Sequence, residues 1–292
     1  MAISYEQLLN RRFAPLEHAY SRRDSMLYAL GIGLGADPLD QGQLAFVYEE
    51  QQKVFPTMPV ILGYPGFWAR EADTGIDWRK LVHAEQAFEL HAPLKPEGRV
   101  IGSNRVSALY DKGPEKGALL CQERLVTDAD SGELIATVHQ VSMLRGDGGF
   151  GGPAGSPPPP HQMPERSADV ICDLPTLPQA ALLYRLSGDF NPLHADPEVA
   201  VGAGFARPIL HGLCTMGVAC HAALRGILQY RAERIRGMRV RFSGVVLPGD
   251  TIRTELWMDG DVISFRATAL ERKVLVLSAG KITLAGNEAA TH

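Results

Sequence analysis

The segment LYRLSGDFNPLH (residues 183–194) has a counterpart earlier in the same chain, LYALGIGLGADPLD (residues 27–40). A Leu-Tyr pair begins both segments and Pro-Leu recurs near the end of each, with only two extra residues in the first copy. Internal similarity of this kind is typical of a duplicated structural unit. We therefore predict two related units.

Each copy precedes a meander of predicted antiparallel strands, in which polar and apolar residues alternate between Gly, Pro and Asp turns. The predicted strands are residues 85–94, 99–110, 118–128 and 134–144, and then 238–246, 251–258, 262–270 and 274–284. Apolar residues at helical spacing predict a helix over residues 209–228 with one buried face, beginning near His211-Gly212. The pattern favours an α+β fold with one helix packed on a sheet in each unit.

The clearest change in composition is RGDGGFGGPAGSPPPPH (residues 145–161), which reads as a connector. Glycine favours a flexible backbone, and the four consecutive prolines favour an extended one. We expect an N-terminal unit over residues 1–145, a linker over 146–165 and a C-terminal unit over 166–292.

The overall composition excludes several functional classes. The chain has 292 residues, of which 45% are hydrophobic and 21% charged, and its net charge is -4. Without a long basic block we expect neither nucleic acid nor a membrane as partner. The N-terminus does not read as a signal peptide and the C-terminal AATH is not a peroxisomal SKL-type signal, so we expect a cytoplasmic protein. The four scattered cysteines suggest neither disulfides nor a zinc knuckle.

The two copies differ at their polar positions. Only the second combines Asp189, Asn191 and His194; the first has Asp40 where the second has His194. Ser-Gly-Asp and Asn-Pro also form turns, so a structural reading stays open. Gly212, at a predicted helix start, could offer a bare backbone N–H to a ligand oxygen. An acid, a base and an oxyanion donor are the groups needed to add water across an activated double bond.

Other motifs fit less well. GIGLGA (residues 31–36) matches a dinucleotide-binding pattern, but it follows a helix-like segment instead of a strand. His194, Asp196 and His211 have no common metal-ligand spacing, and we expect no metal. The absence of GxSxG argues against an acyl-enzyme hydrolase.

Four stretches of the chain carry a family resemblance: residues 184–217 (YRLSGDFNPLHADPEVAVGAGFARPILHGLCTMG), 82–94 (VHAEQAFELHAPL), 111–113 (DKG) and 148–152 (GGFGG). Together they resemble the MaoC-like (R)-specific 2-enoyl-CoA hydratase 2 family. The likeness is to its two-unit members, such as the hydratase domain of peroxisomal multifunctional enzyme type 2.

The resemblance implies a double hotdog fold in which only the C-terminal unit is catalytic, while the N-terminal unit accommodates the acyl chain. It implies that Asp189 and His194 activate water and deliver the proton, that Asn191 holds the geometry, and that the Gly212 N–H binds the thioester oxygen. The implied substrate contacts are His83, Ala84, Lys112, Phe190 and Phe242. The family pattern HGEQ is here His83-Ala84-Glu85-Gln86, so a methyl group narrows the backbone approach at Ala84. No metal or organic cofactor is implied, and the resemblance suggests a homodimer.

The expected reaction is the hydration of trans-2-enoyl-CoA to (3R)-3-hydroxyacyl-CoA. Three alternatives remain open: the same chemistry run as a dehydratase on CoA or acyl-carrier-protein thioesters, a hotdog thioesterase, and an acyl-CoA-binding protein without catalytic activity.

Overall fold

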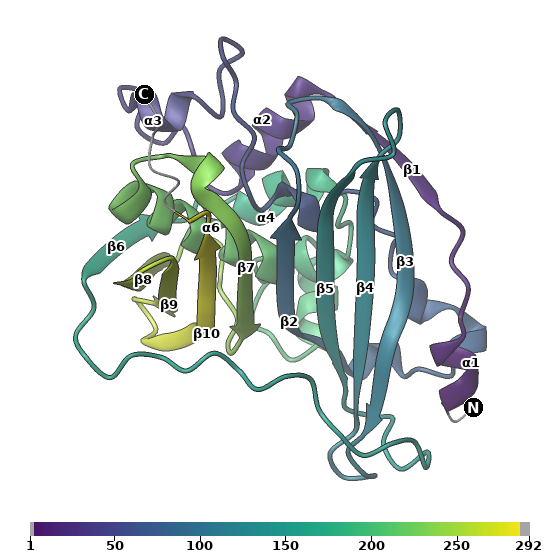
Figure 1. The fold of residues 1–292 in the computed structure, drawn as a ribbon. Helices are drawn as coiled ribbons and strands as arrows, with labels where there is room; N and C mark the ends of the chain where they lie inside the picture. Colours follow the sequence, from purple (N-terminus) through teal and green to yellow (C-terminus); the bar gives the residue numbers. More distant parts are fainter. Residues whose placement is uncertain (1–2, 287–292) are drawn as a thin grey trace.

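The computed structural model describes residues 3–286, in which ten strands form one antiparallel sheet (Figure 1). The C-terminal AATH, and the outermost residues of both predicted units, lie outside the described residues. The strands are β1 (Leu16–Tyr20), β2 (Leu81–Leu90), β3 (Gly98–Asp111), β4 (Ala118–Asp128), β5 (Leu134–Leu144), β6 (Val170–Pro175), β7 (Ile235–Phe242), β8 (Thr251–Asp259), β9 (Val262–Ala269) and β10 (Val274–Leu284).

The strand order reveals the duplication. Across the sheet the order is β1-β3-β4-β5-β2-β7-β10-β9-β8-β6, so each half repeats the same order outward from the centre. All eight predicted strands form, within a few residues of the expected bounds. The edge strands β1 and β6 were not predicted, because five or six residues are too few to show a clear alternation.

The two halves join through β2 and β7, which pair antiparallel at the middle of the sheet. Glu85 lies opposite Arg241 in this ladder, and the Arg241 Nε atom is 2.6 Å from a Glu85 carboxylate oxygen. The Glu85 side chain is nearly buried, so this ion pair is protected from screening better than a surface pair. Hydrogen bonds and charge therefore link the halves into one sheet.

The helices lie mainly on one side of the sheet (Figure 1). The α-helices are α1 (Tyr5–Leu9), α2 (Arg22–Gly31), α3 (Gln41–Leu44), α4 (Ala180–Tyr184), α5 (Pro197–Gly202) and α6 (Gly212–Ala223). The 3-10 turns are η1 (Met58–Val60), η2 (Trp68–Arg70), η3 (Ala72–Thr74), η4 (Trp78–Lys80), η5 (Arg185–Ser187), η6 (Pro192–His194) and η8 (Ala232–Arg234). A π-helical turn, η7 (Leu224–Leu228), extends α6.

The predicted central helix forms as α6 and η7, but the expectation of a single buried face was wrong. Every residue from Cys214 to Ala223 is buried. The sheet covers one side of α6, and the first unit covers another: the Cys214 thiol donates to the Gly31 carbonyl oxygen, and Gly217 has no room for a Cβ beside Ile32. Burial on all sides explains why this helix is apolar nearly throughout its circumference.

The architecture is that of a double hotdog fold, as predicted. The two units differ in their helices: the longest helix of the first unit is α2, with ten residues. Prolines at positions 56 and 59 interrupt the segment before β2, and the short turn η1 of this segment packs against β5. The first unit therefore keeps the sheet of the repeat without a helix as long as α6.

Residues 146–165 contain no helix or strand and connect β5 to the far edge strand β6, passing along one end of the sheet (Figure 1). The His161 Nε2 atom lies 2.7 Å from the Ser264 hydroxyl, which fixes the connector to β9. The placement of a domain boundary there stays a prediction.

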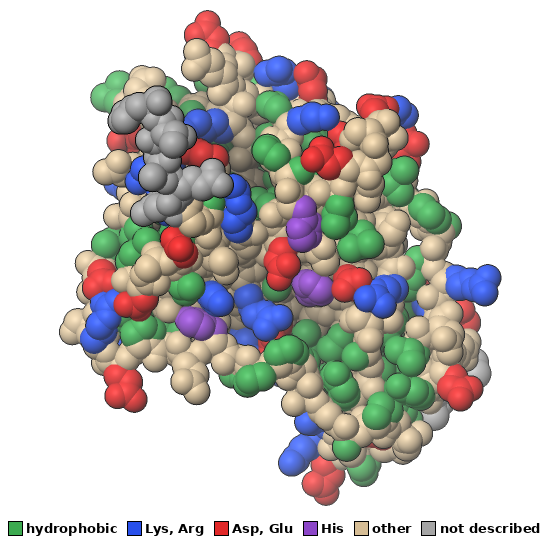
Figure 2. Space-filling model, in the orientation of Figure 1, with side chains coloured by type: hydrophobic (Ala, Val, Ile, Leu, Met, Phe, Trp, Pro, Cys, Tyr) green, Lys and Arg blue, Asp and Glu red, His purple; other side chains and the backbone are tan. Residues whose placement is uncertain are grey.

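The face of the sheet opposite the helices carries acidic and basic side chains mixed together (Figure 2). No helix within residues 3–286 is long and apolar enough to cross a membrane.

Candidate active site

The turn at residues 187–194 places His194 inside the protein. Asn191 caps η6, since its side-chain oxygen accepts from the Leu193 N–H at 3.1 Å. Pro192 follows at the first position of the turn, where its fixed φ is favourable. His194 then ends η6 with only 9% of its surface exposed. The segment therefore forms a turn and can also hold an acid/base side chain, so the two interpretations of its sequence are compatible.

One hydrogen bond defines the protonation of His194. Its Nδ1 atom is 2.8 Å from the Ile209 carbonyl oxygen. A carbonyl only accepts, so Nδ1 carries the proton and the Nε2 lone pair stays available. Burial holds the pKa of His194 below its usual value of 6.5. At neutral pH the side chain is therefore an uncharged base.

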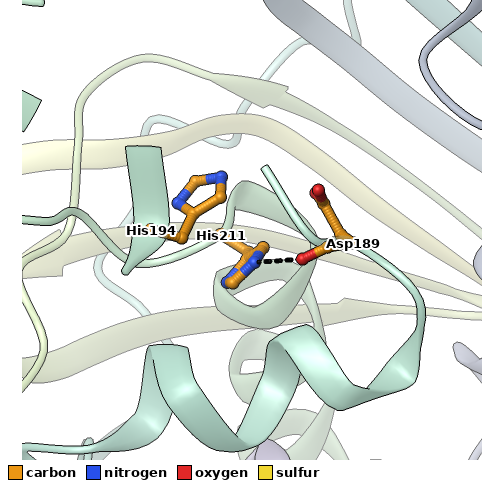
Figure 3. Close-up of side chains that lie close together, drawn as sticks. All are labelled: Asp189, His194 and His211. Atoms are coloured by element: carbon orange, nitrogen blue, oxygen red, sulfur yellow. Dashed lines mark hydrogen bonds between the residues drawn. The ribbon is translucent and has the colours of Figure 1, made fainter. Parts of the chain in front are cut away.

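His211 lies between His194 and Asp189 (Figure 3). Its ring stacks on His194 with centroids 3.7 Å apart, and its Nε2 atom donates to the Asp189 main-chain oxygen at 3.3 Å. Burial and the neighbouring His194 both lower the pKa of His211. The Asp189 carboxylate accepts the Asn191 main-chain N–H at 3.1 Å. Asp189, Asn191 and His194 therefore belong to one hydrogen-bonded turn, which His211 supports.

The predicted oxyanion donor, Gly212, is the first residue of α6. Within the described chain, the side chain of the N-cap residue His211 makes no capping hydrogen bond to the first turn. A Cβ at Gly212 would lie 3.0 Å from the Phe242 ring. The His83 ring packs edge-on against the Phe242 ring, with centroids 4.7 Å apart. Phe242 of β7 therefore packs against two other predicted site residues, Gly212 of α6 and His83 of β2.

The remaining predicted residues lie around this centre. Ala84 is the extra residue of a β-bulge, because the pairing of β2 with β5 shifts register between His83 and Glu85. Phe190 is 59% exposed, with the Arg185 guanidinium over its ring. The Lys112 ammonium donates to the Gly155 carbonyl oxygen, and within residues 3–286 no hydrogen bond or ion pair links it to Asp189 or His194. Its role as a substrate contact stays a prediction.

Comparison with known proteins identifies the family. A family model described as MaoC like domain matches residues 160–279, and one described as MFE-2 hydratase 2 N-terminal domain matches residues 18–146. The chain is 38% identical over 291 residues to the enoyl-CoA hydratase ChsH3 of Mycobacterium tuberculosis, covering 96% of this chain and 98% of the relative. The chain belongs to the MaoC-like enoyl-CoA hydratase 2 family.

Two further relatives of this family cover nearly the whole chain. The peroxisomal enoyl-CoA hydratase 2 of Arabidopsis thaliana is 36% identical, over 96% of this chain and 94% of the relative. The crystal structure of a MaoC-like dehydratase from Phytophthora capsici matches with a TM-score of 0.87 and 33% identity, covering 99% of this chain and 100% of that one. The likeness therefore extends to both units.

His211 and Tyr64 were not among the predicted site residues of this MaoC-like hydratase. His211 follows Leu210, whose N–H donates to the Val246 carbonyl oxygen and holds the start of α6 against the loop between β7 and β8. Tyr64 comes from the first unit, and burial together with the Asp189 charge raises its pKa to about 12. His211 stands next to Gly212 in the family signature, and this position could have identified it as a site residue. No motif in the sequence indicated that Tyr64 lies near the site.

The donor atoms of Asp189, His194 and His211 all lie within 4.8 Å of one another. A carboxylate and two neutral imidazoles are chemically capable of binding a divalent cation. However, the His194 Nδ1 and His211 Nε2 atoms are already engaged with carbonyl oxygens. The free His194 lone pair and the Asp189 carboxylate belong to the same cluster, and both can accept a hydrogen bond from a bound water.

Proposed function

We propose that this protein adds water to trans-2-enoyl-CoA to give (3R)-3-hydroxyacyl-CoA, and catalyses the reverse dehydration. The observation that carries the proposal is the bond from His194 to the Ile209 carbonyl oxygen. It leaves Nε2 as an uncharged base, in a cluster where one donor atom each of Asp189, His194 and His211 lies within 4.8 Å of the others. Nε2 and the Asp189 carboxylate can both accept a hydrogen bond from one water.

In the forward reaction Asp189 and His194 hold this water and take up its proton as the oxygen bonds to C3 of the enoyl thioester. Electrons of the double bond move toward the thioester carbonyl, and the developing negative charge is stabilised by the Gly212 N–H at the start of α6. The proton then adds to C2. Atoms balance, because one water supplies the hydroxyl group at C3 and the hydrogen at C2.

The supporting residues keep this arrangement in place. Asn191 fixes the turn that carries Asp189 and His194. Phe242 packs against Gly212 and His83 packs against Phe242, and the two rings limit how the thioester can approach the helix start. With Ala84, Lys112 and Phe190 they are the proposed substrate contacts.

The two units have different proposed tasks. Residues 166–292 form the catalytic unit and residues 1–145 receive the acyl chain, with the linker at residues 146–165. We propose a homodimer in the cytoplasm. Light scattering of the purified protein tests the dimer: a monomeric mass contradicts it. Because the Arabidopsis relative is named peroxisomal, fractionation of the source cells tests the location.

The activity assay follows the ultraviolet absorbance of the conjugated enoyl thioester and separates the 3-hydroxy enantiomers of the product. We expect loss of absorbance without thiol release, and the (3R) product. Release of free thiol indicates a thioesterase, and ligand binding without turnover indicates a binding protein. Parallel assays on CoA and acyl-carrier-protein thioesters distinguish the carriers.

A further inference from the structure

The helix-facing side of the first unit is unexpectedly polar. Gln86, Gln140 and Gln122 lie directly opposite one another on β2, β5 and β4, forming a row of amides across the sheet. In the second unit, the residues that face α6 are core hydrophobics, including Val240, Phe265 and Ile282. The surface that would receive the acyl chain therefore differs from an ordinary hydrophobic lining.

Arg124 extends this polar surface and is buried without a counter-ion. It lies on β4 opposite Asn104 of β3, and only 6% of its surface is exposed. Its Nη2 atom donates to the Val60 carbonyl oxygen at 2.6 Å, while its buried Nε atom has no partner within the described residues. Within the same residues, no carboxylate lies within ion-pair distance of it.

Such a side chain is unusual, because buried charges in proteins are nearly always paired. Burial lowers the pKa of Arg124 only to about 10, so the guanidinium keeps its charge at neutral pH. The hydrogen bond to a neutral carbonyl satisfies one donor but supplies no negative charge. An anion in front of Arg124 would offset the cost of burying it.

A pocket opens in front of Arg124. Its lining includes Tyr64, Asn104, Gln122, Arg124 and Gln140, and its enclosed volume is about 20 Å³, roughly the room of one water molecule. A second pocket of about 20 Å³ adjoins it and shares the lining residues Tyr64, Gln122 and Gln140. The Arg124 guanidinium lies 5.6 Å from the centre of the Tyr64 ring, and Tyr64 in turn feels the charge of Asp189. The pocket therefore lies on the side of the first unit that faces the catalytic turn.

The register of the sheet gives the distance between His83, near the catalytic turn, and Arg124. His83 pairs with Ser142 and Arg124 with Val138, so the two residues are two strands and four positions apart. At ~4.8 Å per strand and ~3.4 Å per residue, the diagonal across the sheet is roughly 17 Å. A ligand that reaches from His83 to Arg124 therefore needs an extended acyl chain.

We propose that Arg124 binds a carboxylate at the far end of the acyl chain, so that the preferred substrates are enoyl-CoA thioesters of dicarboxylic acids. The inference rests on the proposed hydratase function and deepens it. The guanidinium pairs with the terminal carboxylate, while Tyr64 and the amides of Asn104, Gln122 and Gln140 provide further hydrogen bonds. Short acyl chains do not reach this group and are unaffected by it.

The alternative is that Arg124 only stabilises the segment at Val60 through its carbonyl bond. Binding experiments with saturated acyl-CoA esters separate the two readings without requiring turnover. Three ligands of equal chain length are compared over a series of lengths: one ending in a carboxylate, one in its methyl ester and one in a methyl group. Calorimetry gives Kd for each with the wild-type protein.

We expect the carboxylate ligand to bind about 10-fold or more tightly than both others once the chain is long enough, since hydrogen bonds to charged groups have this strength. In Arg124→Gln this ratio should fall to about one, and Arg124→Lys should keep part of it. Equal Kd values for the three ligands on the wild-type protein would overturn the inference, as would a ratio that survives in Arg124→Gln.

Two controls keep the result interpretable. A short enoyl-CoA should be hydrated equally well by the wild-type protein and Arg124→Gln, whereas a purely structural role would reduce this rate along with the binding of every ligand. If Arg124→Gln does not fold, the carboxylate-to-ester ratio on the wild-type protein still decides the question. A failure to hydrate any enoyl-CoA would contradict the proposed function but not the binding preference.

Discussion

The imidazole rings of His194 and His211 are stacked with their centroids 3.7 Å apart and an interplanar angle of 28°. Each ring donates to a main-chain carbonyl oxygen, His194 to Ile209 and His211 to Asp189. A positive charge on either ring would be poorly solvated and would repel a charge on the other. The pair is therefore kept neutral, which is the state that a general base requires.

The pH dependence of catalysis follows from this neutrality. Because burial lowers the pKa of His194 below 6.5, activity should be constant near neutrality and decline only at more acidic pH. The profile of kcat/KM against pH measures this pKa in the free enzyme. An acidic limb centred above pH 6.5 would contradict the assignment of an unprotonated His194 as base.

The pH dependence of stability has other causes. Burial lowers the pKa of His83 and of His221 to about 4, whereas both titrate near 6.5 in the unfolded chain. Between pH 4 and 6.5 the unfolded chain binds more protons than the folded protein. The free energy of unfolding is therefore at its full value above pH 6.5 and decreases as the pH falls toward 4. Each histidine contributes a decrease of at most about 1.4 kcal/mol per pH unit.

Urea unfolding at several pH values tests this. His221→Gln should reduce the loss of stability on acidification, and His91→Gln, at an exposed position, should leave it unchanged. Equal acid sensitivity in His221→Gln and the wild-type protein would argue against this explanation.

The packing of Phe242 against Gly212 makes a specific prediction for the oxyanion donor. In Gly212→Ala the new methyl group meets the ring at 3.0 Å, and either the ring or the helix start must move. We expect kcat/KM to fall roughly 10- to 100-fold, as for other small misplacements of catalytic groups. Adding Phe242→Leu should recover part of the activity by making room. Full activity in the single variant would show that this close approach is not needed.

Metal chelation tests whether Asp189, His194 and His211 act as protein groups or as ligands. The proposed mechanism uses their lone pairs directly on water, so incubation with EDTA followed by desalting should leave kcat unchanged. Metal analysis of the untreated protein serves as the control. Loss of activity that a divalent cation restores would instead identify a metal centre at this cluster.

The sequence predicted most of the fold because the units fold through local patterns. The long strands of both meanders alternate clearly, and the repeated Leu-Tyr at Tyr28 and Tyr184 indicated the duplication. In the structure these two tyrosines contact one another, with ring centroids 5.7 Å apart. Burial of α6 on every side could not be predicted, because it depends on Gly31 and Ile32 from the other unit.

Part of the site could also be predicted from a local pattern in the sequence. Asp189, Asn191 and His194 share one turn, so the sequence brings them together. The bond that sets the tautomer of His194 joins it to Ile209 across an intervening helix, and no local pattern indicates it. The burial of Arg124 likewise depends on the segment at Val60, which is distant in sequence and packs over β4.

The central claim is that Asp189 and His194 together activate water for addition to an enoyl thioester. It is tested most directly by the hydration rate constant of purified Asp189→Asn and His194→Gln, with Asp130→Asn and His91→Gln as matched surface controls. We predict that each site variant stays folded and loses about 10²- to 10⁴-fold in kcat, while both controls keep wild-type rates. A folded Asp189→Asn or His194→Gln with the wild-type rate would contradict the account.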